Sequence, residues 1–291
     1  MALTVFISNF GKMAFKAGLL VLTLCIGSFA IPVAEDDYSI FFDHTDPSAR
    51  IVGGTVAPAT PHMVGLTTGT ITRSLLCGGS VITNRHVLTA AHCIVPVQSG
   101  TGLLASLRGI VGSLRFATGG TALVFTRGVI HNNYRPSPII KNDIGILATS
   151  GNIPIGGGVA VINLNYNWVG AGVDTYVTGW GRTSAGGALS QVLLRLDART
   201  VDGNTCRDDV ARRFRELNMW LVPVVDPNLE ICTFLANGRG TCNGDSGSAL
   251  VRRDNNQQIG VVSWGIPCAL NAPDMFARVS AYGTWINQNL N

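Results

Sequence analysis

Short apolar or alternating runs, separated by Gly, Pro, Asn and Ser, recur roughly every 8–15 residues along this chain of 291 residues. The clearest runs lie at 121–125, 144–147, 174–178, 191–196, 259–263 and 275–279. Strands of this length and spacing are typical of a sandwich or a barrel, and 35 Gly with only 13% charged residues also favour an all-β chain. Residues 204–217 and 281–290 instead space their apolar residues as helices do.

The first residues have the pattern of a secretory signal peptide. Lys12 and Lys16 precede an apolar stretch over 17–30 that ends in the small residues Ser28 and Ala30, with Phe29 between them. The stretch is too short to span a membrane. We therefore predict a signal peptide over 1–30, secretion, and no membrane attachment of the mature chain.

Residues 31–50 form a short acidic segment without Cys, in which five Asp or Glu stand against one base, Arg50. Such a segment cannot bury a core of its own. Arg50 is followed directly by the apolar sequence IVGG at 51–54, which predicts a processing site. The expected parts are therefore a propeptide over 31–50 and a main domain over 51–291.

The charge of the main domain is unevenly composed. Residues 51–291 hold 17 Arg and a single Lys, Lys141, against 12 acids, and none of those acids lies in 51–142. A net charge of +4 for the whole chain is too mild and too spread out for a nucleic-acid partner. Because Arg keeps its charge at a pH where Lys loses it, this surface suits strongly alkaline fluid, although a compositional bias of the lineage explains it equally well.

Seven Cys occur, of which Cys25 lies in the signal peptide. The six that remain are an even number in a secreted chain, which indicates three disulfides with fifteen possible pairings. No C-x-x-C or H-x-x-x-H spacing supports a zinc site, so no metal and no cofactor are expected.

Three segments together hold the groups of a nucleophilic hydrolase: LTAAHC at 88–93, NDIGIL at 142–147 and GTCNGDSGSA at 240–249. Alone, each is compatible with an ordinary turn, cap or structural His. Together they supply Ser246, which needs a base to become a nucleophile, and His92, which needs a carboxylate such as that of Asp143 to fix its tautomer. The glycines around Ser246 allow a tight turn whose amides point at an oxyanion.

These segments carry a family resemblance. The motifs IVGG, TAAHC, DIGIL, GDSGS and SWG occur in order at 51–54, 89–93, 143–147, 244–248 and 263–265, and with them residues 51–291 resemble the chymotrypsin/trypsin family of secreted serine endopeptidases. The resemblance implies two six-stranded antiparallel Greek-key barrels, roughly 51–165 and 166–280, and a C-terminal helix.

The resemblance also implies a role for each site residue. His92 is the expected general base, Asp143 its orienting partner and Ser246 the nucleophile, and the amides of Gly244 and Ser246 form the oxyanion hole. The implied disulfides are Cys77–Cys93, Cys206–Cys232 and Cys242–Cys268.

A zymogen is expected as well. By resemblance, a trypsin-like protease cuts after Arg50, and the new α-ammonium of Ile51 then pairs with Asp245. A buried carboxylate beside the nucleophile needs such a positive partner.

Three segments would form the pocket for the side chain before the scissile bond. Gly240 stands where trypsin-like members have Asp, which disfavours trypsin specificity, while Asp274 stands where many members have Gly. This pattern resembles insect and crustacean chymotrypsin-like and collagenolytic (brachyurin-like) proteases, although Asp274 at the rim could simply face water. The expected pocket residues are Gly240, Thr241, Asn243, Ser263, Trp264, Gly265 and Asp274.

The expected function is that of a digestive endopeptidase with chymotrypsin-like or broad specificity, secreted to an extracellular space such as a gut lumen. Its partners would be protein or peptide substrates and protein protease inhibitors, and it would be a monomer. A cascade protease and a catalytically silent homologue that acts as a binding protein are the alternatives. The 25 residues between Cys206 and Cys232 are more than in common members, so this loop either reshapes the distal substrate groove or is only surface.

Overall fold

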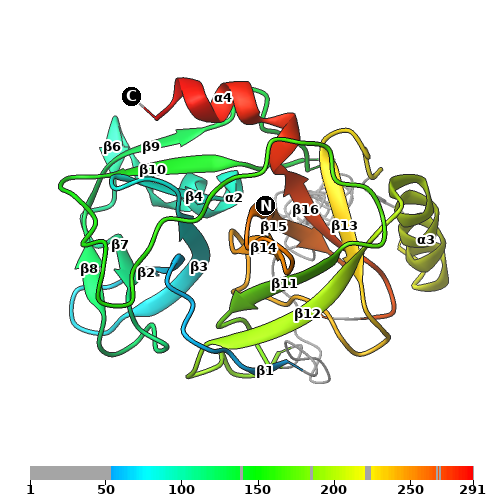
Figure 1. The fold of residues 1–291 in the computed structure, drawn as a ribbon, viewed down its shortest axis with the longest axis horizontal. Coiled ribbons are helices and arrows are strands. Elements are labelled where there is room, and N and C mark those ends of the chain that lie inside the picture. Colours follow the sequence, from blue (N-terminus) through cyan, green and yellow to red (C-terminus); the bar gives the residue numbers. More distant parts are fainter. Residues whose placement is uncertain are drawn as a thin grey trace, which may run out of the picture. The chain divides into compact units, whose positions relative to one another are not determined.

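This computed structural model describes residues 54–137, 140–183, 186–219, 224–266, 268 and 270–290. The expected signal peptide, the propeptide and the Arg50–Ile51 junction lie outside the described residues. Most of the regular structure is antiparallel sheet, as Figure 1 shows. In the described part of the chain, no helix is both long and apolar enough to cross a membrane.

Seven strands form the first sheet, in the order β8-β7-β2-β3-β4-β10-β9. Its edge strands β8 and β9 are separated in the chain only by Val124, so the sheet curls until its two edges meet there, without a ladder between them. The strands are β2 (Met63–Thr68), β3 (Ser74–Val81), β4 (His86–Thr89), β7 (Arg108–Val111), β8 (Thr121–Leu123), β9 (Phe125–Ile130) and β10 (Gly145–Thr149).

Six strands of the second sheet close into a barrel, because β12 pairs with both β11 and β13. A seventh strand, β1 (Thr55–Val56), lies first in the chain and pairs with the start of β12, on the edge opposite β11. The six are β11 (Asp174–Gly179), β12 (Leu194–Val201), β13 (Glu230–Phe234), β14 (Ala249–Arg252), β15 (Gln258–Gly265) and β16 (Asp274–Arg278). The all-β expectation is thus confirmed, with one closed barrel and one curled sheet in place of two closed six-stranded barrels.

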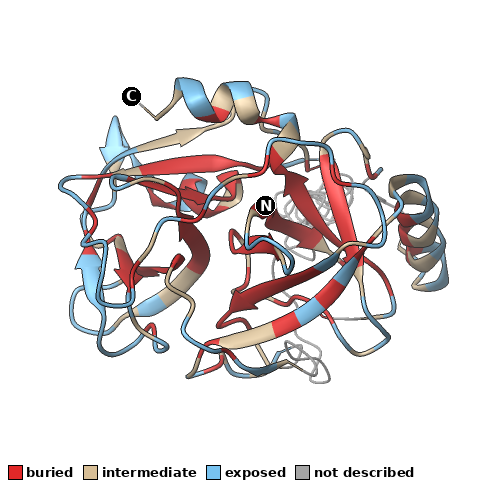
Figure 2. Cartoon of the chain, in the orientation of Figure 1, coloured by how far each residue is buried: buried red, intermediate tan, exposed pale blue. Residues whose placement is uncertain are grey.

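The inner faces of both sheets are buried, as Figure 2 shows. Alternation along β12 illustrates the cause, since Leu196, Ala198 and Thr200 face inward and the residues between them are exposed. A two-stranded hairpin, β5 (Gln98–Ser99) and β6 (Gly102–Leu103), forms a separate small sheet that pairs with neither of the two large sheets.

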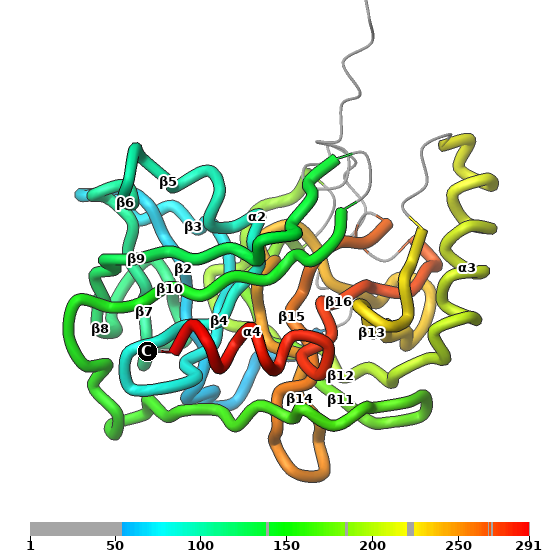
Figure 3. The backbone as a smooth tube through the Cα atoms, turned by 90° about the horizontal axis from the view of Figure 1, so that it is seen from above, coloured from blue at the N-terminus to red at the C-terminus, as the bar shows by residue number. Residues whose placement is uncertain are grey.

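Both expected helices form. α3 (Gly203–Glu216) begins where Asp202 accepts the N–H groups of Asn204 and Thr205, each at 3.0 Å, which is a typical N-cap. It buries one stripe, Cys206, Val210 and Phe214, at four-residue spacing, and in Figure 3 it runs along one side of the second sheet.

The C-terminal segment begins with a 3-10 turn, η4 (Val279–Ala281), and continues as α4 (Gly283–Gln288). It packs on the first sheet through Tyr282 and Trp285, whose rings each lie 5.2 Å from the ring of His131. Two short helices follow β4: α2 (Ala91–Ile94) and the 3-10 helix η2 (Val95–Val97).

Candidate active site

Strand pairing brings His92 and Asp143 together. β4 and β10 pair with Thr89 opposite Gly145, so α2 after β4 meets the residues before β10. His92 Nδ1 lies 2.7 Å from Asp143 Oδ2, and the backbone N–H of His92 donates to Asp143 Oδ1 at 2.9 Å. Since an ionised carboxylate only accepts hydrogen bonds, Nδ1 of the neutral imidazole carries the proton and Nε2 carries the lone pair.

A bulge adds a third hydrogen bond to Asp143. The register of β15 against β16 shifts between Val262 and Trp264, and bulges re-aim side chains. Ser263 lies in this shift, and its hydroxyl donates to Asp143 Oδ2 at 2.6 Å. Sequence reasoning assigned Ser263 only to the pocket wall and missed this contact.

The environment keeps Asp143 ionised. Its side chain is only 2% exposed, and burial opposes ionisation of the carboxyl group. The neighbouring His92 imidazole and the hydrogen bonds from His92 and Ser263 outweigh burial, so the pKa of Asp143 lies below its ordinary value. A permanent negative charge therefore faces His92 at neutral pH.

The loop that carries Ser246 contacts the loop that carries His92. The carbonyl of Ser246 accepts the N–H of Gly78 on β3 at 2.7 Å. A Cβ placed on Gly247 would lie 3.2 Å from the backbone nitrogen of Ala90, two residues before His92. Residues from two different sheets, far apart in sequence, are thus gathered at one place.

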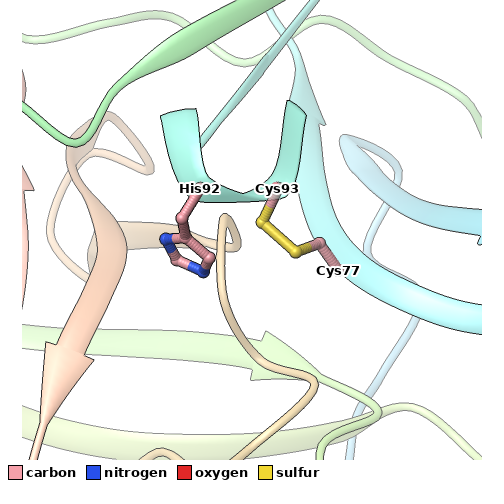
Figure 4. A group of neighbouring side chains, drawn as sticks. All are labelled: Cys77, His92 and Cys93. Carbon is pink, nitrogen blue, oxygen red and sulfur yellow. A yellow bond between two sulfur atoms is a disulfide. The ribbon is translucent and has the colours of Figure 1, made fainter. Parts of the chain in front are cut away.

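A disulfide, Cys77–Cys93, links β3 to α2 beside His92. Cys77, His92 and Cys93 offer ligand atoms within 4.8 Å of one another. However, the two sulfurs are bonded to each other (Figure 4) and are not the thiolates that zinc needs, so this group is not a cation site. The other disulfides are Cys206–Cys232 and Cys242–Cys268, and all three are the pairs that the resemblance implies.

The turn before Ser246 leaves two amides available. Gly244 has φ +99°, a backbone conformation that suits glycine, and the N–H of Asp245 closes the turn on the carbonyl of Cys242 at 3.0 Å. Within the described residues, the N–H groups of Gly244 and Ser246 donate to no protein acceptor.

Asp245 is a fully buried carboxylate. It accepts the N–H groups of Gly181 at 2.8 Å and Cys242 at 3.0 Å. A Cβ on Gly179 would come within 2.0 Å of its Oδ1, so the two glycines make room for it. Burial, with a smaller contribution from the charge of Asp274, raises the pKa of Asp245 to about 7. No Lys, Arg or His among the described residues pairs with it.

A narrow pocket of about 30 Å³ opens beside Ser246. Five of the seven expected pocket residues line it. The lining residues are Thr241, Cys242, Asn243, Ser246, Val262, Ser263, Trp264, Gly265, Ile266 and Cys268.

The other two expected residues, Gly240 and Asp274, are buried but do not line this pocket. Asp274 Oδ2 accepts the N–H of Thr241 at 2.8 Å, and a Cβ on Gly265 would lie 3.4 Å from Asp274 Oδ1. The carboxylate therefore lies behind the lining, between two walls, and burial raises the pKa of Asp274 to about 7.

Comparison with known proteins decides the family. The sequence model of the family described as Trypsin matches residues 51–286. The chain belongs to the trypsin family. It is a serine endopeptidase whose substrates are proteins and peptides.

Relatives of this trypsin-family chain include enzymes named for both specificities. Chymotrypsin-2 of Vespa crabro is 33% identical over 82% of this chain and 99% of its own length. Chymotrypsin of Phaedon cochleariae is 31% identical over 93% of this chain and 96% of its own length. Trypsin zeta of Drosophila melanogaster is 31% identical over 95% of each chain.

The loop between Cys206 and Cys232 of this trypsin-family chain borders a second cavity, of about 860 Å³. Its walls come from the start of α3, from 224–228, from Trp168 and from the segment that holds Arg135 and Lys141. The loop between Cys206 and Cys232 therefore lies beside the segment that immediately precedes Asp143.

Proposed function

We propose that Ser246 is the nucleophile, His92 the general base and Asp143 the orienting carboxylate of this endopeptidase. The observation that carries the proposal is the double hydrogen bond by which Asp143 holds both the ring and the backbone of His92. With its tautomer fixed, His92 presents Nε2 to the neighbouring Ser246 loop.

The proposed reaction runs in two halves. Ser246 Oγ attacks the scissile carbonyl while His92 Nε2 takes its proton, and Asp143 stabilises the imidazolium that forms. The N–H groups of Gly244 and Ser246 would donate to the oxyanion. His92 then protonates the leaving amine, and water hydrolyses the acyl-enzyme by the same steps in reverse.

Labelling tests this assignment. After treatment with trypsin, the chain should react stoichiometrically with an organophosphonate, and mass spectrometry should locate the adduct on Ser246. A Ser246→Ala variant should remain unlabelled. Absence of an adduct on the processed chain would support the silent-homologue alternative instead.

We also propose that the intact chain is a zymogen. Two observations support this: the pocket beside Ser246 has only about the volume that one water molecule occupies, and Asp245 is a buried carboxylate without a cation among the described residues. Cutting after Arg50 would supply the α-ammonium of Ile51 as that cation.

The Arg50→Gln precursor is therefore expected to stay inactive after incubation with trypsin, whereas the unaltered chain gains activity and a new N-terminus at Ile51. Hydrolysis of a peptide substrate and N-terminal sequencing measure the two. Full activity of the Arg50→Gln chain without cleavage would contradict the zymogen proposal. Arg73→Gln, at an exposed arginine-to-carbonyl contact, is the matched control and should be processed normally.

The pKa of Asp245 gives the precursor a pH signature. Its folded pKa, about 7, lies above its ordinary value of 3.8, so ionisation opposes folding. The contribution of Asp245 to stability is therefore greatest below pH 4 and is lost as pH rises to 7. Two precursors are compared: Arg50→Gln, and Arg50→Gln with Asp245→Asn. Between pH 5 and pH 8, the free energy of unfolding of the second should rise relative to that of the first by about 2–3 kcal/mol.

Urea unfolding at the two pH values measures this difference. His62 adds a pH dependence of its own to the stability, because burial lowers its pKa to about 4. Comparing the two variants cancels that contribution, since both contain His62. In the processed enzyme the sign should reverse, because Asp245 then pairs with the ammonium of Ile51. The same sign in both forms would speak against that pairing.

For specificity, we propose a preference for large apolar or aromatic side chains, with broad tolerance. No acidic side chain of the described residues lines the pocket beside Ser246, and the Asp274 carboxylate is held by the N–H of Thr241. Peptides that differ only in the residue before the scissile bond should be cleaved faster with Phe or Leu than with Arg. Near-exclusive cleavage after Arg or Lys would show that Asp274 reaches the substrate.

The signal-like residues 1–30 support secretion, and the absence of a Cys-rich segment between 31 and 50 favours a digestive role in a gut lumen over a cascade role. We further propose that the processed enzyme is a monomer and that protein protease inhibitors bind it and block its activity. Sedimentation of the processed enzyme with and without such an inhibitor tests both points.

A further inference from the structure

The single Lys of residues 51–291 lies in a largely buried ion pair. Lys141 Nζ is 2.5 Å from Glu230 Oε2, and the two side chains are 18% and 6% exposed. In the Arg–Asp and Arg–Glu pairs of the described residues, the carboxylate side chain is 41–72% exposed. A buried pair contributes little to stability beyond what apolar side chains would, which leaves its purpose to be explained.

Glu230 is the centre of this arrangement. Besides Lys141, its carboxylate accepts the N–H of Asp226 at Oε2 and the indole Nε1–H of Trp264 at Oε1, both at 2.7 Å. Burial raises the pKa of Glu230, although Lys141 and these donors oppose the rise. One side chain thus joins three separate segments of the chain.

Two of those segments belong to the active site. Trp264 lines the pocket beside Ser246 and is 3% exposed. Lys141 precedes Asp143 by two residues, and its Nζ lies 5.9 Å from the centre of the Trp264 ring. The indole is therefore held at its edge by Glu230 and faced by Lys141.

We propose that Glu230 is a positioning residue for substrate selection: its hydrogen bond to Trp264 fixes the pocket wall that selects the side chain before the scissile bond. The indole N–H of Trp264 has no other hydrogen-bond acceptor within the described residues. Without Glu230 the indole can turn, and the pocket no longer has one shape. The inference rests on the proposed pocket and adds a residue to it that does not touch the substrate.

A matched pair of double variants tests the proposal. Lys141→Met/Glu230→Met replaces the ion pair with apolar side chains and removes the acceptor for Trp264. Lys141→Met/Glu230→Gln also removes both charges but keeps an acceptor oxygen. Each is measured in the processed enzyme, with active sites titrated, as the ratio of kcat/KM for two peptides that carry Phe or Ala before the scissile bond.

The Met/Met variant is expected to change this ratio by about fivefold or more, the scale of one lost hydrogen bond, mainly through KM. The Met/Gln variant should return the ratio close to that of the unaltered enzyme. Equal ratios in both variants, whatever their stability, would overturn the proposal and leave Glu230 a structural residue.

Trp264→Phe keeps the ion pair and removes the indole N–H together with part of the ring, so it provides a second test if the Met/Met variant does not fold. It should reproduce the altered ratio, and an unchanged ratio would again overturn the proposal. Glu216→Gln, on the exposed face of α3, is the control and should change nothing. Organophosphonate labelling of Ser246 is run on each variant, so that a failure of the proposed catalytic assignment is seen separately.

Discussion

Ser246→Ala is expected to lower kcat by about five to six orders of magnitude in the processed enzyme, because alanine has no oxygen to form the acyl-enzyme. Binding of substrate should persist, so KM should change little. Hydrolysis of a peptide anilide with a Phe residue before the scissile bond measures both constants. Near-ultraviolet circular dichroism should coincide with that of the unaltered enzyme, since the serine side chain is small and only partly buried.

A matched control lies two residues away. The Ser248 hydroxyl is buried and has no hydrogen-bond partner in the described part of the chain, so Ser248→Ala removes no hydrogen bond and should leave kcat within about twofold. If Ser248→Ala inactivated the enzyme as strongly as Ser246→Ala, the nucleophile would have been misassigned.

Asp143→Asn is expected to lower kcat by about four orders of magnitude at neutral pH while the fold stays intact. A carboxylate accepts from both the ring and the backbone of His92, whereas an amide has only one acceptor atom. The imidazole then settles in the tautomer whose Nε2 carries the proton and cannot act as the base. Initial rates with titrated active sites measure the loss.

A graded variant checks the same cause. Ser263→Ala leaves both contacts between Asp143 and His92 and removes only the hydroxyl donor to Asp143 Oδ2, so it should cost about tenfold in kcat. A loss from Ser263→Ala as large as that from Asp143→Asn would mean that Ser263 does more than support the carboxylate.

Local sequence pattern predicted the parts of the fold that local chemistry determines. The helix expected over 204–217 forms over Gly203–Glu216, because Asp202 caps its start. The strand expected at 174–178 lies within β11, and the one expected at 144–147 forms one residue later, as β10. Near 191–196 the strand begins later, at Leu194, since the preceding residues form a turn around Ser190. The residue types of the motifs and the family resemblance that they carry predicted His92 and Asp143 as partners, and the two are in direct contact.

Pattern could not show what depends on contacts between distant segments. The bulge that turns Ser263 toward Asp143 is a mismatch between two strands, and neither strand alone reveals it. Glu230 belongs to none of the sequence motifs, and only the fold surrounds it with Lys141 and Trp264. Likewise, Asp274 was expected on a pocket wall, but its hydrogen bond to Thr241 draws the carboxylate behind that wall.

His92 and Asp143 lie next to strands β4 and β10 of the curled sheet, whereas Ser246 precedes β14 of the closed barrel. Residues of both sheets share one buried core, so catalytic rate reports the alignment of the two halves as well as the integrity of each. Mild heat, pressure or low urea that lets one half slip against the other would silence the enzyme while both sheets still give their full spectroscopic signal. Inhibitors that bridge the two halves should for the same reason act as clamps, protecting the molecule from inactivation and from digestion by its own copies.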